Sequence, residues 1–170
     1  NPLDFINKVS SIINVQKSAL IVDHVTYNTT NETFDTDIFT AEYTRGNFAK
    51  AYLAKHAIQD YVFTDGTAEK SVERKFVEEL DTADEVVVYA KLPRGFYIPT
   101  PVGKYSPDWA IAFKKGVVKH IFFVAETKGT LQSMELRAIE KAKISCAEKL
   151  FEKLSNGEVH YGQVKDYKSL

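Results

Sequence analysis

The chain has 170 residues, of which 44% are hydrophobic and 26% charged, and these proportions are typical of a globular protein with one well-buried core. A formal net charge of −1 excludes an overall basic protein, so any contact with nucleic acid would have to come from local patches. The single cysteine, Cys146, excludes an internal disulfide and a thiolate metal cluster, which favours a reducing compartment such as the cytoplasm, and no apolar run is long enough to span a membrane.

The first third of the chain, residues 1–64, is predicted to form a helix, a β-hairpin and a second helix. Apolar residues between positions 4 and 15 recur at helical spacing. The segments Ala19–Tyr27 and Ile38–Tyr43 have the composition of strands joined by a polar loop. Apolar residues at helical spacing follow over residues 48–60. We expect this helix-hairpin-helix segment to pack on the rest of the chain or to link to it.

The second segment, residues 65–170, is predicted to begin with a helix that runs from the N-cap residue Thr67 to Leu80. Its buried stripe includes Val77 and Leu80, and the same stripe continued backwards reaches Glu73. An acid in that position is unusual, because burying an unpaired carboxylate costs several kcal/mol. Glu73 either lies at the edge of the stripe and reaches water, or points into a functional site as a further acid.

A β-branched strand is predicted at Glu85–Ala90, and the segment Lys91–Gly103, with three prolines and two glycines, cannot continue it regularly. Positive charges and aromatic rings alternate through this segment and could follow a phosphate backbone. A solvated loop whose aromatic rings pack on the core would explain the same composition equally well. The candidate DNA-contacting residues are Lys91, Arg94, Lys104 and Tyr105.

Two neighbouring apolar runs, residues 107–113 and 120–128, are predicted to form buried strands that carry charge at one end. Since side chains alternate along a strand, Glu126 and Lys128 project to the same side. The second run is apolar on both faces, as in a central strand. If the two strands form an antiparallel hairpin centred on the short turn between them, Asp108 lies opposite Glu126.

Two carboxylates side by side repel each other, and the usual relief is a divalent cation with oxygen ligands, most often Mg²⁺ in cells. Asp108 and Glu126, with the backbone carbonyl of Thr127, would hold this ion. Lys128, two residues after Glu126, would supply a fixed positive charge beside the ion. These residues predict a divalent metal site.

The spacing Pro-Asp, then Glu-x-Lys, resembles the PD-(D/E)XK nuclease motif. The longer segments Leu92–Ile111 and Val124–Gly129 resemble the C-terminal nuclease domain of type III restriction enzyme Res subunits. Ser71–Phe76 resembles the helix of that family whose glutamate often joins the site, so the resemblance implies that Glu73 is a further metal ligand.

After Gly129 a long helix is predicted from about Ser133 to Leu154, with Lys143 on its apolar stripe. Lys143 either extends to water or faces acids; the resemblance implies that this helix borders the site, where Lys143 would reach the scissile phosphate or a carboxylate. A last strand is predicted at Val159–Val164. The order of the second segment, αβββαβ, is that of the PD-(D/E)XK core, an α/β (α+β) fold with a central mixed sheet flanked by helices.

The resemblance implies Mg²⁺-dependent cleavage of double-stranded DNA by a restriction system. Its implied partners are an N-terminal, ATP-dependent motor region of the same subunit and a separate modification methyltransferase. ATP would serve only the motor, since this sequence contains no P-loop. The alternative is a catalytically silent nuclease-like domain that serves DNA binding or subunit assembly, but the presence of Asp108, Glu126 and Lys128 together argues against a decayed site.

Overall fold

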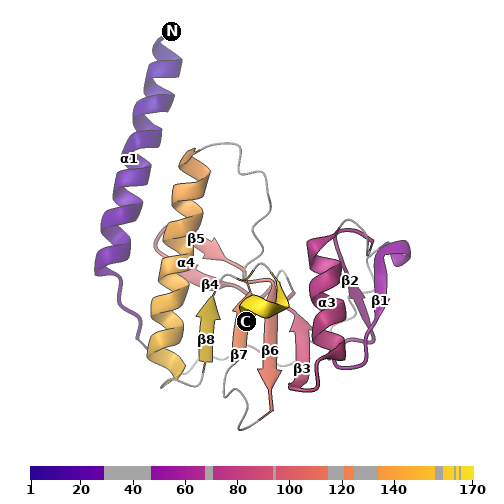
Figure 1. Cartoon of the computed structure of the whole chain (residues 1–170). Coiled ribbons are helices and arrows are strands. Elements are labelled where there is room, and N and C mark those ends of the chain that lie inside the picture. The colour runs from indigo at the N-terminus through magenta and orange to yellow at the C-terminus, as the bar shows by residue number, and fades with distance from the viewer. Residues whose placement is uncertain are drawn as a thin grey trace.

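The computed structural model of the chain describes residues 1–28, 47–67, 71–93, 95–114, 121–124, 134–155, 159–162, 164 and 166–170, with the backbone alone for 121–124, 134–137 and 155. Figure 1 shows the arrangement of these elements around one central sheet. None of the helices in these ranges has the length and apolar character that crossing a membrane requires.

The central sheet has four strands in the order β3-β6-β7-β8 (Figure 1). Strand β6 (Trp109–Phe113) pairs antiparallel with β3 (Val86–Lys91) on one side and with β7 (Ile121–Val124) on the other. Strand β8 (Val159–Gly162) runs parallel to β7. A parallel pair needs a long crossover, and the chain uses helix α4 (Met134–Ser155) for it. The sheet is therefore mixed, as predicted, and α4 confirms the predicted long helix to within one residue at each end.

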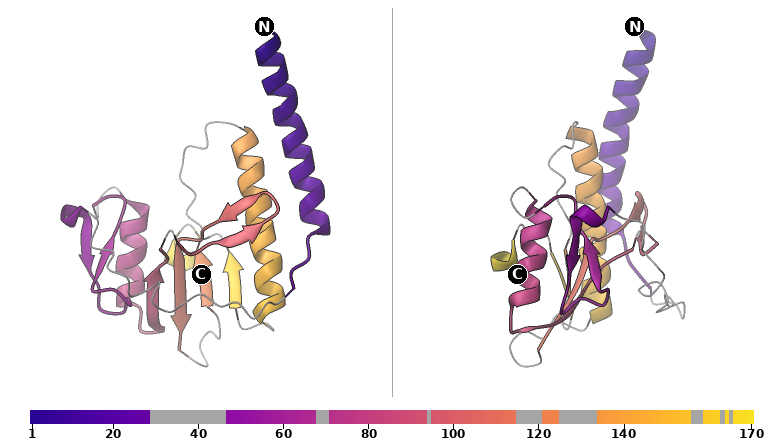
Figure 2. Two further views of the ribbon diagram at one scale, coloured as in Figure 1. Left: turned by 180° about the vertical axis from the view of Figure 1, so that it is seen from behind. Right: turned by 90° about the vertical axis from the view of Figure 1, so that its right-hand side faces the viewer.

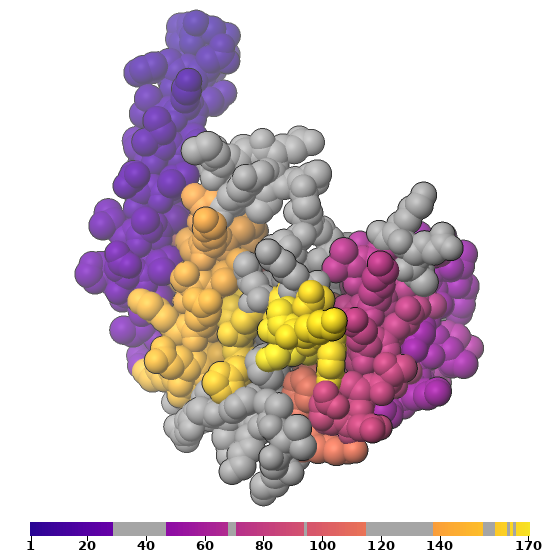
Figure 3. Space-filling view, viewed as in Figure 1, coloured from indigo at the N-terminus to yellow at the C-terminus, as the bar shows by residue number. Residues whose placement is uncertain are grey.

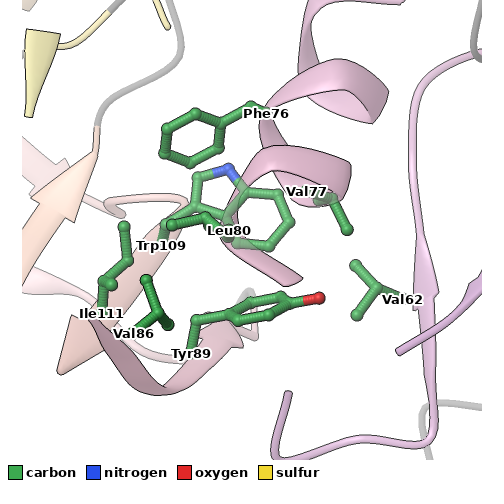
Figure 4. Packing of buried hydrophobic residues seen from close by; sticks show 8 residues of the cluster. All are labelled: Val62, Phe76, Val77, Leu80, Val86, Tyr89, Trp109 and Ile111. Atoms are coloured by element: carbon green, nitrogen blue, oxygen red, sulfur yellow. The ribbon is translucent and has the colours of Figure 1, made fainter. Parts of the chain in front are cut away.

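Helix α3 (Val72–Thr82) packs on one face of this sheet. Its N-cap residue is Ser71, whose hydroxyl accepts the amide of Arg74 at 3.0 Å, so the predicted cap at Thr67 is wrong. Figure 4 shows the ring of Trp109 between Phe76 and the ring of Tyr89 in the main core. This core consists of Val62, Phe76, Val77, Leu80, Val86, Tyr89, Trp109 and Ile111.

On the other side of the sheet a short hairpin packs against α4, as the rear view in Figure 2 shows. Strands β4 (Ile98–Thr100) and β5 (Gly103–Tyr105) form it, in the segment that was predicted to be irregular. Gly103 has a φ of 118°, a conformation that residues with a side chain rarely adopt. The hairpin buries Ile98 and Tyr105 against α4 in a second cluster. Tertiary packing therefore stabilises a hairpin that contains two prolines, Pro99 in β4 and Pro101 in the turn.

The first third of the chain differs most from its prediction. Helix α1 spans Pro2–His24, so the strand predicted at Ala19–Tyr27 is wrong, while Ile38–Tyr43 lies outside the described residues. Lys149 of α4 donates to the carbonyls of Val22 (2.5 Å) and Asp23 (3.3 Å), which satisfies acceptors at the end of α1. Figure 3 shows the N-terminal half of this helix standing clear of the rest of the molecule.

The helix predicted over residues 48–60 is also wrong. A short 3₁₀ turn, η1 (Phe48–Lys50), leads into strand β1 (Ala51–Leu53), which pairs antiparallel with β2 (Tyr61–Phe63). The cause lies in α3, where the buried carboxylate of Asp81 accepts the backbone amides of Lys55 and His56 at 2.8 Å each. Those amides would bond within the chain segment itself if it were helical.

The hairpin β1–β2 shares the core of the second segment. Val62 of β2 belongs to the same cluster as Phe76 and Trp109, and Ala57 bridges Tyr89 of β3. At the other end of the chain, η2 (Tyr167–Ser169) meets α3, where the Tyr167 amide donates to Glu79 at 3.3 Å. The division of the chain at residue 64 stays a prediction, and residues on both sides of it pack together.

Candidate active site

Asp108 lies directly before the first residue of β6, an inner strand of the central sheet, and is half-buried. Its backbone carbonyl accepts the amide of Leu92 at 2.7 Å, so the end of β3 fixes the start of β6. The preceding Pro107 is fully buried. Because proline has no N–H group to donate to a neighbouring strand, it suits the position immediately before a strand. The backbone that carries Asp108 is thus held on both sides.

The register between β6 and β7 differs by one residue from the prediction. Trp109 pairs with Val124, whereas the register that places Asp108 opposite Glu126 would pair Trp109 with Ala125. A slip of one residue moves a strand's side chains to the other face. In the observed register Trp109 and Ile111, each only 1% exposed, face α3.

The rest of the predicted catalytic set lies outside the described residues: Glu126, Thr127 and Lys128, as does the candidate DNA contact Arg94. Strand β7 is described to Val124, two residues before Glu126 in the sequence. Within the described ranges, no group of three or more histidines, cysteines, aspartates or glutamates could hold a metal. Asp108 is the one predicted catalytic residue that the structure places.

Glu73 is buried on α3, and 5% of its surface is exposed. Its Oε1 lies 2.5 Å from the Nζ of Lys91, and its Oε2 accepts the backbone amide of Asp65 at 2.7 Å. The interpretation in which Glu73 reaches water is therefore wrong. Both oxygens of this carboxylate are bonded within the protein.

Lys91, a candidate DNA contact, uses its ammonium group inside the protein. In addition to Glu73, it donates to the carbonyl of Phe63 at 2.8 Å and lies 5.5 Å from the centre of the Trp109 ring. Lys104, in contrast, is exposed, with its Nζ 3.8 Å from the centre of the Tyr97 ring. Among the described candidates for a phosphate contact, Lys104 is the one that faces solvent.

Tyr105, the remaining candidate DNA contact, is buried with 6% of its surface exposed. Its hydroxyl accepts a 2.5 Å hydrogen bond from the hydroxyl of Tyr161 on β8. Burial raises the pKa of Tyr105 to about 12; the bond from Tyr161 opposes this rise, and the charge of Asp108 adds to it. Tyr105 is a core residue, and its hydroxyl lies close enough to Asp108 for the charge of that carboxylate to act on it.

Lys143 also lies on the α4 side. Its Nζ is 3.2 Å from Oε1 of Glu140, one turn earlier in the same helix. A Cβ added at Gly103 would lie 3.6 Å from Cε of Lys143, so the lysine packs on the β4–β5 turn. Of the two expectations for Lys143, the one in which it faces an acid is confirmed. The acid, Glu140, belongs to the same helix.

Two contacts near the candidate site escaped the sequence reasoning, the ion pair Glu73–Lys91 and the hydroxyl pair Tyr105–Tyr161. The sequence contained a signal for the first. Tyr89 faces the core, and the period of two in a strand puts Lys91 on the same face, so α3 and β3 each direct one charge inward. No comparable signal existed for the tyrosine pair, because the strand β5 itself was not predicted.

Comparison with known proteins agrees with the resemblance found in the sequence. Residues 55–167 match a family model described as an endonuclease domain. Over 104 residues, the chain is 33% identical to the type III restriction-modification enzyme EcoP15I Res subunit of Escherichia coli. It is 32% identical over 104 residues to the EcoPI Res subunit of Escherichia phage P1.

Each alignment covers 60% of this chain and 11% of the relative, so the chain corresponds to a small part of these Res subunits. No solved structure matches the chain significantly. The family match includes α3, the complete central sheet and α4, and therefore covers the elements that position Asp108. The chain belongs to this endonuclease domain family and is related to the Res subunits of type III restriction-modification enzymes.

Proposed function

We propose that the chain is an Mg²⁺-dependent endonuclease domain that hydrolyses phosphodiester bonds in double-stranded DNA as part of a type III restriction enzyme. The observation that carries this proposal is the position of Asp108. It directly precedes the central strand β6, and the neighbouring strand β7 leads in the sequence to Glu126-Thr-Lys128. Family membership supports the same reaction class.

The donor chemistry of the site fits a hard divalent cation. The half-buried carboxylate of Asp108 supplies one oxygen ligand, and we propose Glu126 and the Thr127 carbonyl as the others. When bound, the ion would lower the pKa of a coordinated water and neutralise charge on the phosphate. Lys128 would donate hydrogen bonds to the attacking water and to the phosphate oxygen on which charge develops.

The exposed ammonium of Lys104, on the hairpin beside the site, is available to a DNA phosphate. With a net charge of −1 the domain would hold DNA weakly by itself. We therefore propose that the other parts of a type III enzyme supply most of the DNA binding, namely an ATP-dependent motor region in the same subunit and a separate modification subunit. The working compartment would be the cytoplasm.

Metal-dependent stabilisation tests the proposed site. Mg²⁺ or Mn²⁺ should raise the unfolding temperature of the chain, because an ion that binds only the folded state stabilises it. Asp108→Ala should abolish this rise, whereas Asp4→Ala, which removes an acid from α1, should leave it intact. An unchanged metal-dependent rise in the Asp108 variant would show that the ion binds elsewhere, and the site would then be wrongly assigned.

A further inference from the structure

The buried ion pair between α3 and β3 connects three elements of the fold. Lys91 Nζ reaches the Glu73 carboxylate at 2.5 Å and the Phe63 carbonyl of β2 at 2.8 Å, while Glu73 also accepts the amide of Asp65. The carboxylate side chain is 3% exposed and that of Lys91 is 34% exposed. Glu73 in particular would be costly to leave without its partner, since an unpaired buried charge is strongly unfavourable.

The same lysine lies next to the backbone that carries Asp108. Lys91 is the register partner of Trp109, and its ammonium lies 5.5 Å from the centre of the indole ring. The next residue, Leu92, donates its amide to the carbonyl of Asp108 at 2.7 Å. A movement of Lys91 would therefore shift the start of β6, both through the backbone pairing of β3 with β6 and through the contact with the indole ring of Trp109.

Both carboxylate oxygens of Glu73 are bonded on the face of β6 that carries Trp109 and α3, one to Lys91 and the other to the amide of Asp65. Asp108 has different surroundings, because its charge acts on the hydroxyls of Tyr105 and Tyr161, which belong to the cluster against α4.

We propose that Glu73 and Lys91 form a positioning pair, in which Glu73 holds Lys91 and Lys91 fixes the Trp109 backbone and with it Asp108. In this role Glu73 acts through Lys91 and is not a metal ligand. The inference rests on the proposed function, because Asp108 is the ligand that the pair positions. It is an alternative to the expectation that the glutamate of this helix joins the metal site.

The two roles predict opposite effects of Lys91→Met on metal binding. If Glu73 were a metal ligand, Lys91→Met would bind Mn²⁺ at least as well as the parent, because it removes a neighbouring positive charge. Glu73→Gln would then weaken Mn²⁺ binding. A positioning pair predicts that Lys91→Met and Glu73→Gln both weaken Mn²⁺ binding, by about 10- to 100-fold, the range for losing a group that orients a metal ligand. The double variant should be no weaker than either single variant, because both changes break the same interaction.

The experiment measures Mn²⁺ binding to the chain by calorimetry, at a temperature where each variant is folded. Trp109 is the only tryptophan, so its emission reports on the ring beside Lys91. Lys91→Arg should retain binding and emission. Glu78→Gln is the matched control, since Glu78 pairs with Arg74 at 2.9 Å on the exposed side of α3. If a single variant fails to fold, the neutral double variant, which leaves no unpaired charge, replaces it.

Two results would overturn the proposal: Glu73→Gln weakens Mn²⁺ binding while Lys91→Met does not, or both variants bind Mn²⁺ like the parent. The second result would leave the pair a purely structural role. Asp108→Ala separates the proposal from the function on which it rests. If Asp108→Ala binds Mn²⁺ like the parent, the metal site is wrongly assigned and both proposals fail. If Asp108→Ala loses Mn²⁺ binding while the Glu73 and Lys91 variants bind Mn²⁺ like the parent, only the positioning role fails.

Discussion

The carboxylate of Asp81 holds the segment after β1 in place, and its removal should destabilise the fold strongly. Asp81 is 4% exposed and accepts four groups: the amides of Lys55 and His56 at 2.8 Å, the hydroxyl of Tyr89 at 3.1 Å and that of Tyr52 at 3.2 Å. In Asp81→Ala the hydroxyls can turn toward other acceptors. The two amides cannot, because the backbone fixes their direction.

Each buried donor left without an acceptor costs about 1–3 kcal/mol, so the two amides predict a loss of about 2–6 kcal/mol in the free energy of unfolding. For a chain of this size, each kcal/mol lowers the unfolding temperature by about 2–4 °C. Urea denaturation and a thermal scan measure the two quantities. Asp84→Ala, at an exposed position after the same helix, is the control. An Asp81→Ala variant as stable as this control would refute the reasoning.

The same carboxylate predicts a dependence on pH. Burial alone would raise the pKa of Asp81, but the bonds from His56, Lys55, Tyr89 and Tyr52 outweigh it and hold the pKa below its ordinary value. A lowered folded-state pKa means that the stabilisation is complete above the pKa of the unfolded chain, about 3.9, and is lost as the pH falls through the folded-state value. The stability difference between the parent and Asp81→Asn should therefore shrink below about pH 4 and stay constant above it.

Three further predictions concern the hairpin, the N-terminal helix and the proposed catalytic lysine, Lys128. Gly103→Ala should destabilise the chain by roughly 1–3 kcal/mol in thermal unfolding, because of its φ of 118°, while Gly162→Ala, which meets no atom within 4 Å, should not. Lys149→Met should speed amide exchange in the last turn of α1 and leave exchange in α3 unchanged; equal exchange in the parent and the variant would contradict the capping role. Lys128→Ala should lower DNA cleavage by roughly 10²–10³-fold with metal affinity intact, whereas Glu126→Ala should lose both, and calorimetry that finds equal metal loss would contradict this division.

The elements with long, regular patterns could be predicted from the sequence. Helix α4 and strands β3, β6 and β8 were found because their apolar periods run over many residues or because β-branched residues cluster. Asp108 was found because a charge at the end of a buried strand has no structural benefit there. The resemblance to a nuclease family rested on those same residues, and the family match confirms it.

The errors have a common physical cause, which is that tertiary contacts override local pattern. Residues 48–60 have helical spacing, yet Asp81 captures the amides that such a helix would need. The hairpin β4–β5 forms in a proline-rich segment because α4 covers its apolar side chains. The register between β6 and β7 differs by one residue from the one predicted, because the spacing between two acids does not fix the pairing of the strands that carry them.

DNA cleavage by the complete type III enzyme, of which we propose this chain to be the nuclease domain, tests the central claim most directly. With Mg²⁺ present, the parent should convert supercoiled circular DNA to linear product, and the Asp108→Ala enzyme should leave it intact although it assembles and hydrolyses ATP as the parent does. Lys17→Ala, which changes an exposed charge on α1, should cleave like the parent. An Asp108→Ala enzyme that cuts DNA at the parental rate would contradict the assignment of the active site.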